Sequence, residues 1–185
     1  MTLNVNECFT KLAVDATALS EWALVEYVKR WHTRVDGATI NPLFSNWHGY
    51  KTDNMVNLPL DKCFELCPEL VQINNIAEIS YVAVMKHPPK KVVRLHIDMQ
   101  EGVGINMMVV DEHGGSMCAF VNRETNKTEK LDYQPNTMYL FNTQVYHTIY
   151  NFAGNRYTLT VRFKLNKQLL SYRHMKKIIR KINLL

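Results

Sequence analysis

Leu95-His96-Ile97-Asp98 is the stretch around which the rest of this 185-residue sequence is organised. It ends a run of β-branched and aliphatic residues that begins at Val92, and such a run predicts a β-strand. Successive side chains of a strand point to opposite faces, so the imidazole of His96 and the carboxylate of Asp98 would share one face. The stretch therefore predicts a strand that presents an imidazole and a carboxylate together.

A second apolar segment, from Met138 to Asn151, carries His147 among residues that favour strands. Two histidines and one carboxylate on facing strands make the facial triad that binds non-haem Fe(II) and leaves three coordination positions open. A lone His-x-Asp pair is a weak signal, but a later histidine followed by Arg156 on another β-like run strengthens it. We therefore predict that His96, Asp98 and His147 bind a metal ion.

The middle of the chain consists of short apolar runs separated by turns. The expected strands are residues 78–85, 92–98, 105–110, 116–121, 137–142, the run around His147, and 156–165. About seven short strands preceded by helices predict a mainly β fold, a small sandwich or barrel with helical buttresses.

Two of the expected strands carry polar residues with a bearing on function. In the last strand, Arg156, Thr158, Thr160 and Arg162 alternate with apolar residues and would share one face. Asn106 is the one polar residue of its strand. A buried asparagine needs hydrogen-bond partners, so we expect Asn106 either to bridge strands or to contact a bound ligand.

Helices are expected outside this core, and the length suits a single domain. The expected helices span about Asp15 to Arg34, about Pro68 to Ile76, and Lys167 to about Asn183 with Asn166 as its cap. Residues 38–61 are expected to be loop, and His87 an exposed turn residue. The domain then divides into three parts: 1–77 as helical and loop support, 78–165 as the core, and 166–185 as a basic C-terminal helix.

The net charge of +5 is unevenly distributed along the chain. Nine basic residues follow Asp132, and no acidic residue does. Such a basic end can bind nucleic acid or another polyanion, although it is more often the solvated face of a terminal helix. The sequence does not determine the oligomeric state.

Cysteine usage and hydropathy indicate the compartment. Cys8, Cys63, Cys67 and Cys118 are expected to be unpaired thiols, as in a reducing cytoplasm. No apolar run approaches the roughly 20 residues of a membrane helix, and the first residues lack a secretory-signal pattern. We therefore expect a cytoplasmic globular protein with no membrane partner.

From Arg94 to Phe163 the sequence resembles the 2-oxoglutarate/Fe(II)-dependent oxygenases, whose core is a double-stranded β-helix of the jelly-roll, cupin-like kind. The His-x-Asp pair, the later histidine and the following arginine occur in the order that this superfamily uses. The aspartyl/asparaginyl β-hydroxylases and proline hydroxylase-like proteins are the most similar group. The sequence departs from that group at Met107 and Met108, where a proline is more usual.

The resemblance implies an enzyme that hydroxylates a C–H bond of an amino-acid, peptide or protein substrate while 2-oxoglutarate is decarboxylated to succinate. It implies Fe(II), 2-oxoglutarate and O2 as cofactor and co-substrates, with ascorbate as a supporting reductant. The implied iron ligands are His96, Asp98 and His147, and the implied 2-oxoglutarate contacts are Arg156, Thr158, Asn106 and Arg162.

Two other interpretations remain open. The Arg156-x5-Arg162 spacing resembles the end of the AlkB-type nucleic-acid demethylases, in which one arginine holds 2-oxoglutarate and the other helps to position the base. Thr158 stands where that family usually has asparagine. The other alternative is a non-catalytic, cupin-like protein that binds a metal or ligand, and such a protein would show no 2-oxoglutarate turnover.

Overall fold

The computed structural model describes residues 5–35, 55–98, 102–164 and 170–185, and for residues 31–35 it describes the backbone alone. The helices are α1 (Val5–Cys8), α2 (Thr17–Val35), α3 (Leu60–Leu66), α4 (Glu69–Asn74) and α5 (Tyr172–Lys181). The strands are β1 (Phe9–Lys11), β2 (Met55–Leu58), β3 (Ile79–His87), β4 (Lys91–His96), β5 (Gly104–Asp111), β6 (Met117–Val121), β7 (Thr128–Leu131), β8 (Met138–Phe141), β9 (His147–Asn151) and β10 (Arg156–Phe163).

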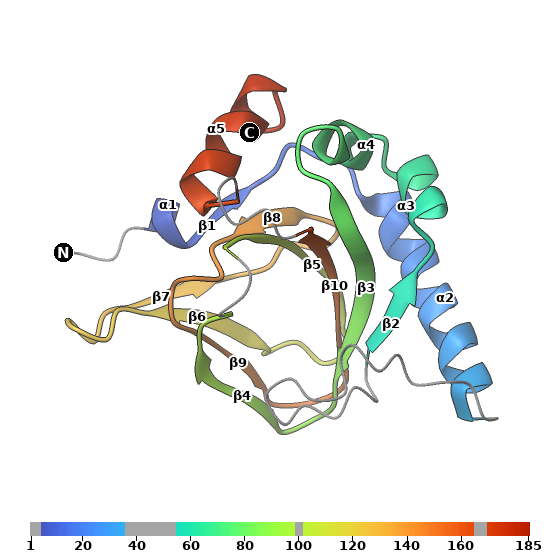
Figure 1. Cartoon of the computed structure of the whole chain (residues 1–185). Helices are drawn as coiled ribbons and strands as arrows, with labels where there is room; N and C mark the ends of the chain where they lie inside the picture. The colour runs from blue at the N-terminus through green and yellow to red at the C-terminus, as the bar shows by residue number, and fades with distance from the viewer. Residues whose placement is uncertain (1–4, 36–54, 99–101, 165–169) are drawn as a thin grey trace.

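The strands form two antiparallel sheets that curve around a common interior (Figure 1). The six-stranded sheet has the order β1-β8-β5-β10-β3-β2, and the four-stranded sheet has the order β4-β9-β6-β7. From β3 to β10 the chain passes repeatedly between the sheets, which is the topology of a double-stranded β-helix. The predicted mainly β, jelly-roll fold is confirmed.

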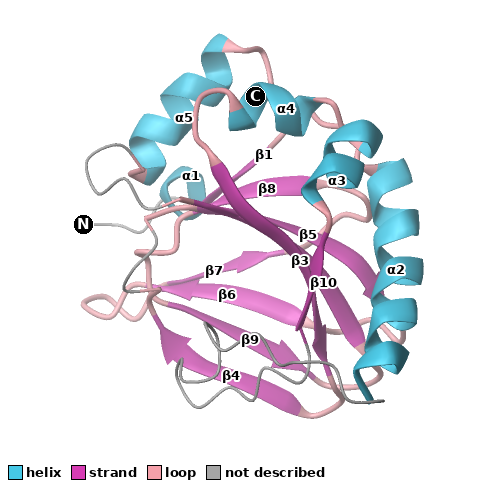
Figure 2. Ribbon diagram, turned by 45° about the vertical axis from the view of Figure 1, so that its right-hand side comes forward, coloured by secondary structure: helices cyan, strands magenta, loops and turns pink. Residues whose placement is uncertain are grey.

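Helices cover the outer face of the six-stranded sheet, as Figure 2 shows for α2 and α3. The alternation predicted for the last strand is observed in β10. The apolar residues of β10 lie in the buried core beneath the helices, together with residues such as Leu19 of α2, Leu70 of α4 and Ile179 of α5. Arg156, Thr158, Thr160 and Arg162 take the opposite face, toward the other sheet.

A smaller core fills part of the space between the sheets. Phe120 of β6 is its centre, with ring centroids 4.6 Å from Phe141 of β8 and 5.6 Å from Phe9 of β1. The cluster also includes Cys8 and Cys118, and the four cysteines are buried, with no disulfide among them. This apolar packing fills the interior beside His147, whose ring centroid is 5.0 Å from that of Phe141.

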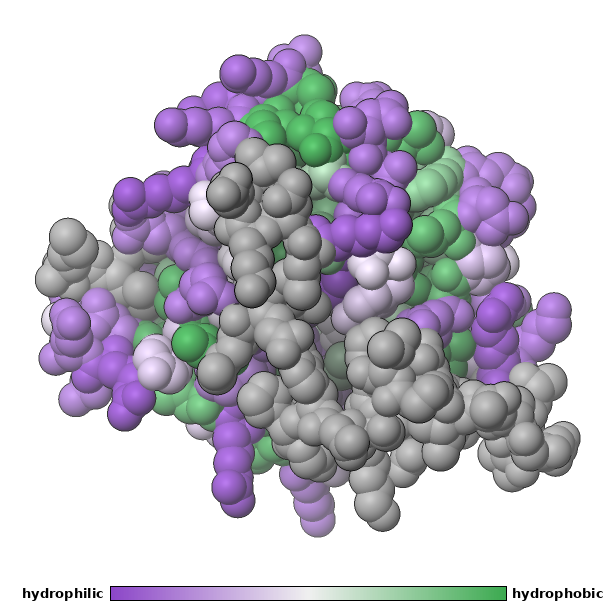
Figure 3. Space-filling model, viewed as in Figure 1, coloured by the Kyte–Doolittle hydropathy of each residue, from purple (hydrophilic) through white to green (hydrophobic). Residues whose placement is uncertain are grey.

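Helix ends follow the expected capping chemistry. The backbone N–H of Thr17, the first residue of α2, donates to Asp15 Oδ1 at 3.0 Å, so the Asp15 side chain satisfies one of the free N–H groups at the start of this helix. The helix α5 begins later than Lys167: it starts at Tyr172, and the backbone N–H of His174 donates to Ser171 Oγ. The predicted cap Asn166 lies outside the described residues. Hydrophobic side chains show between α5 and α4, while hydrophilic groups cover their outer surfaces (Figure 3). No described helix is both long and apolar enough to cross a membrane.

Several elements were missed or misplaced by the sequence analysis. The short strands β1 and β2 extend the six-stranded sheet at its two edges, and β7 lies in a segment for which we expected no strand. Most of the expected 38–61 loop lies outside the described residues. The prediction for His87 was wrong, because it ends β3 and is buried rather than exposed.

Candidate metal centre

A bulge in β4 turns His96 into the interior. β4 pairs with β9 through Val93 opposite Ile149 and then His96 opposite His147, so one extra residue is inserted on the β4 side. Without it, strict alternation from the buried Val93 would place His96 on the outer face. The inserted residue instead leaves Leu95 42% exposed on the outside and aligns His96 with His147.

The Asp98 carboxylate reaches the same point from just beyond the strand. The prediction that His96 and Asp98 share a regular strand was wrong, because β4 ends at His96. The backbone of Asp98 is anchored to the segment that leads into β9: its N–H donates to the Thr143 carbonyl at 3.0 Å, and its carbonyl accepts from Gln144 Nε2 at 2.7 Å. These bonds fix Asp98 without a sheet partner.

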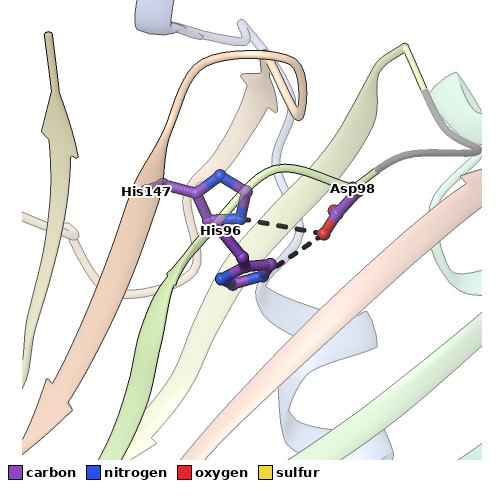
Figure 4. A group of neighbouring side chains, drawn as sticks. All are labelled: His96, Asp98 and His147. Carbon is purple, nitrogen blue, oxygen red and sulfur yellow. Dashed lines mark ion pairs between the residues drawn. The ribbon is translucent and has the colours of Figure 1, made fainter. Parts of the chain in front are cut away.

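His96, Asp98 and His147 converge as predicted (Figure 4). One nitrogen or oxygen atom from each lies within 4.8 Å of the other two. Asp98 Oδ1 is 3.3 Å from His96 Nε2 and 3.9 Å from His147 Nε2. Two imidazoles and one carboxylate that converge from one side are the ligand set that suits Fe(II) in non-haem oxygenases.

Backbone hydrogen bonds determine which nitrogen of each histidine faces Asp98. His96 Nδ1 is 2.7 Å from the Arg94 carbonyl, and His147 Nδ1 is 2.9 Å from the Val145 carbonyl. A carbonyl accepts only from an N–H, so each Nδ1 carries the proton and each neutral ring turns its Nε2 lone pair toward the carboxylate. Two lone pairs and a carboxylate oxygen repel one another unless a cation lies between them, so the site favours a metal ion or a proton.

The ionisation of the three groups follows from their surroundings. When His96 Nε2 carries a proton, it donates a hydrogen bond to Asp98, and this bond raises the pKa of His96. Burial lowers the pKa of His147 to about 4. Burial by itself raises the pKa of Asp98, but the hydrogen bond from His96 and the positive charge of Arg162 outweigh it and leave that pKa below its ordinary value. At neutral pH the site therefore offers a carboxylate and a neutral His147.

Arg156 and Thr158 lie on the interior face of β10. Arg156 is 0% exposed, and none of its three guanidinium nitrogens has a hydrogen-bond partner among the described residues. Thr158 Oγ1 is also buried without a partner. Asp111 is opposite Arg156 in the β5–β10 register, but it accepts from the Ser116 N–H, and no ion pair joins it to Arg156 within the described structure.

Asn106 and Arg162 form a separate group nearer to the candidate metal-binding residues. Asn106 Oδ1 accepts from Thr160 Oγ1 at 2.8 Å and from Arg162 Nη1 at 3.1 Å, so Asn106 bridges β5 and β10. Arg162 Nη2 is 4.0 Å from Asp98 Oδ2. Gly104 has no side chain, and this leaves room for the Arg162 guanidinium. A Cβ built at Gly104 would lie only 2.3 Å from Arg162 Nη1.

Three residues near Arg156 were not identified from the sequence. His87 is its register partner on β3, the ring of Tyr133 lies 5.3 Å from its guanidinium carbon, and Asn151 binds the backbone at the end of β3. The alternation of β3 would have placed His87 on the interior face, but the following Pro-Pro-Lys-Lys sequence suggested a turn.

No family model matches the sequence, and a search of curated proteins gives no match. Solved structures are similar, however. AviO1 from Streptomyces viridochromogenes aligns with a TM-score of 0.60 and 14% identity, over 87% of this chain and 91% of that one. A prolyl-4-hydroxylase from Pseudomonas putida gives 0.56 and 13%, over 85% and 92%. The viral collagen prolyl hydroxylase vCPH from Paramecium Bursaria Chlorella virus-1, solved with 2-oxoglutarate, gives 0.55 and 9%, over 84% and 94%.

The chain has the fold of the 2-oxoglutarate/Fe(II) oxygenases. At these identities the similarity is one of fold, and it confirms the fold that the resemblance implied. Within this oxygenase fold, the His96, Asp98 and His147 cluster is a candidate metal site.

Proposed function

We propose that the protein is an Fe(II)- and 2-oxoglutarate-dependent dioxygenase that hydroxylates a C–H bond of an amino-acid or peptidyl substrate. When bound, Fe(II) would activate O2 so that one oxygen atom enters the substrate as hydroxyl and the other enters succinate, formed with CO2 from 2-oxoglutarate. The chain itself would hold the metal, orient the co-substrate and exclude water.

His96, Asp98 and His147 would hold the metal. Their Nδ1 hydrogen bonds to backbone carbonyls already orient both imidazoles, as is usual for histidine ligands in metal sites. Arg162 would steady the Asp98 carboxylate through its charge, and Asn106 would hold Arg162 in place.

The buried, unpartnered guanidinium of Arg156 carries the proposal. A charged group removed from water is costly unless an opposite charge and hydrogen bonds compensate it. Arg156 therefore calls for a buried anion, and a guanidinium binds a carboxylate through two parallel N–H bonds. The remote carboxylate of 2-oxoglutarate has this chemistry, and Thr158 Oγ1 is available to bond it as well.

The substrate class rests on the sequence resemblance and on the structural neighbours. Two of these neighbours are prolyl hydroxylases by name, which supports an amino-acid or peptidyl substrate. The identity of that substrate is a separate question from the class of reaction.

Succinate formation from 2-oxoglutarate tests the proposed class. Anaerobically purified protein is supplied with Fe(II), ascorbate and O2, without a prime substrate. We expect iron-dependent succinate that is lost in His96→Ala and reduced about hundredfold in Arg156→Met, since breaking a buried charge pair costs several kcal/mol. His174→Ala and Arg173→Met, both exposed on α5, are the matched controls and should retain activity. If the wild type neither forms succinate nor binds 2-oxoglutarate, a cupin-like binding protein becomes the better interpretation.

A nucleic-acid substrate is the second candidate. Both arginines of the Arg156-x5-Arg162 spacing lie on the interior face of β10, as the AlkB-type resemblance requires, and α5 exposes Lys177 and Arg180. An enzyme of that type would bind single-stranded DNA with an affinity that falls steeply as salt rises. Binding that does not respond to salt, or is absent, excludes this candidate.

A further inference from the structure

His87 shares the interior face of the barrel with Arg156. The β3–β10 register places His87 opposite Arg156 and Met85 opposite Thr158. Directly opposed residues of antiparallel strands have Cβ atoms about 5 Å apart on the same face. Val84 points the other way, into the core beneath the helices, so the alternation of β3 independently directs His87 inward.

The backbone of His87 is held firmly in this position. Asn151 Nδ2 lies 2.8 Å from the His87 carbonyl, 2.7 Å from the Pro88 carbonyl and 3.0 Å from the Gly154 carbonyl. Two amide hydrogens are thus shared among three carbonyls. This contact ties the end of β3 to the turn that precedes β10, and it fixes His87 relative to Arg156.

The imidazole of His87 has an unused hydrogen-bonding atom. His87 is 5% exposed, and its Nδ1 has no partner among the residues that the structure describes. Burial lowers the pKa of His87 to about 3, and the positive charges of Arg156 and Lys91 act in the same direction. The ring is therefore neutral at physiological pH and can present one N–H without adding a second cation beside Arg156.

Tyr133 lies beside Arg156. The guanidinium carbon of Arg156 is 5.3 Å from the centroid of the Tyr133 ring, within the range of a cation–π contact. A carboxylate binds a guanidinium at its N–H edge, in the guanidinium plane. Three buried side-chain atoms beside Arg156 on β3, β10 and β5 have no hydrogen-bond partner in the described structure: His87 Nδ1, Thr158 Oγ1 and Asp111 Oδ1. Of these, only the His87 ring and the Thr158 hydroxyl can donate a hydrogen bond to an anion.

We infer that His87 is a co-substrate-binding residue, whose Nδ1–H donates to the remote carboxylate that Arg156 holds and thereby selects 2-oxoglutarate over 2-oxo acids that lack this carboxylate. The inference rests on the proposed function, since it concerns the same co-substrate. It assigns to β3 a contact that the motif residues of β4, β9 and β10 do not provide.

Isothermal titration calorimetry of the full-length, Fe(II)-loaded protein under argon tests the inference. The ligands are 2-oxoglutarate and 2-oxobutyrate, which keeps the 2-oxo acid group but has no remote carboxylate. The variants are His87→Leu, which removes the donor, and His87→Gln, whose side-chain amide can donate. His174→Leu on α5 is the control at an exposed histidine.

We expect His87→Leu to weaken 2-oxoglutarate binding about ten- to hundredfold, the usual effect of losing a hydrogen bond to a charged group. Binding of 2-oxobutyrate should change by less than about twofold, and His87→Gln should recover most of the lost affinity. Equal weakening for both ligands, or unchanged 2-oxoglutarate binding in His87→Leu, overturns the inference alone. Absence of 2-oxoglutarate binding by the wild type overturns the proposed function as well.

Discussion

Replacing Arg156 by methionine should stabilise the ligand-free protein while removing most of its response to 2-oxoglutarate. Arg156 is wholly buried and its guanidinium has no hydrogen-bond partner among the described residues. Methionine has a similar length and flexibility, and it carries no charge to be removed from water. The substitution therefore raises the stability of the ligand-free protein and lowers its stabilisation by 2-oxoglutarate. A simple loss of packing cannot produce both effects.

The magnitude follows from the contacts of Arg156. Leaving a buried charged group unpaired costs about 3–4 kcal/mol, at the upper end of the range for unsatisfied polar groups. Losing the cation–π contact with Tyr133 costs about 1–2 kcal/mol in return. The free energy of unfolding should thus rise by about 2 kcal/mol, which corresponds to a Tm higher by about 4–8 °C for a chain of this size.

Urea unfolding with and without 2-oxoglutarate measures both effects. In the wild type, ligand at about 100 times its Kd should add about 2.7 kcal/mol to the free energy of unfolding, and the same ligand concentration should add less than about 0.5 kcal/mol in Arg156→Met. Arg173→Met is the control, since its side chain is 84% exposed and its loss should change stability by less than about 0.5 kcal/mol. If ligand-free Arg156→Met is less stable than the wild type by more than about 2 kcal/mol, the premise that the Arg156 guanidinium is unpaired in the ligand-free protein is refuted.

Three further predictions concern neighbouring residues. Burial lowers the pKa of His87 to about 3 in the folded protein, against about 6.5 in the unfolded chain. The unfolded state therefore binds more protons, and the free energy of unfolding falls as the pH drops below about 6.5. His87→Gln should flatten this decline in urea titrations across pH. Gly104→Ala should force Arg162 away from Asn106, and succinate formation should fall about tenfold or more with a nearly unchanged unfolding midpoint; unaltered activity would argue against a role for Arg162. Asn151→Ala should lower the free energy of unfolding by about 2–4 kcal/mol, because buried carbonyls lose their donor, and a change below about 1 kcal/mol in thermal or urea unfolding would contradict this.

The sequence predicted what depends on short-range pattern. The alternation in β10 identified the interior face with Arg156 and the face that packs on the helices, because a strand with two different environments must alternate. The order of His96, Asp98 and His147 indicated the convergence that the structure shows. These features need no knowledge of how distant segments are arranged.

The features that the sequence did not predict depend on tertiary contacts. Asp98 is held by Thr143 and Gln144, which follow it by more than 40 residues, so a regular strand was the natural but wrong expectation. His87 at the end of β3 is likewise held by a distant residue, because Asn151 Nδ2 donates to its backbone carbonyl. Strands as short as β1 and β7 carry too little pattern of their own, and they form because a neighbouring strand offers hydrogen bonds.

The extra residue in β4 also bears on how the molecules behave toward one another. β4 is an edge of the four-stranded sheet, and an exposed edge can recruit a strand from another molecule. Because Val92 and Leu95 are exposed and apolar, a regular β4 would pair readily with such a strand. The irregular spacing breaks the ladder that an incoming strand would need. The same insertion that turns His96 toward Asp98 and His147 would thus also oppose edge-to-edge pairing, and a regular β4 would lose both effects.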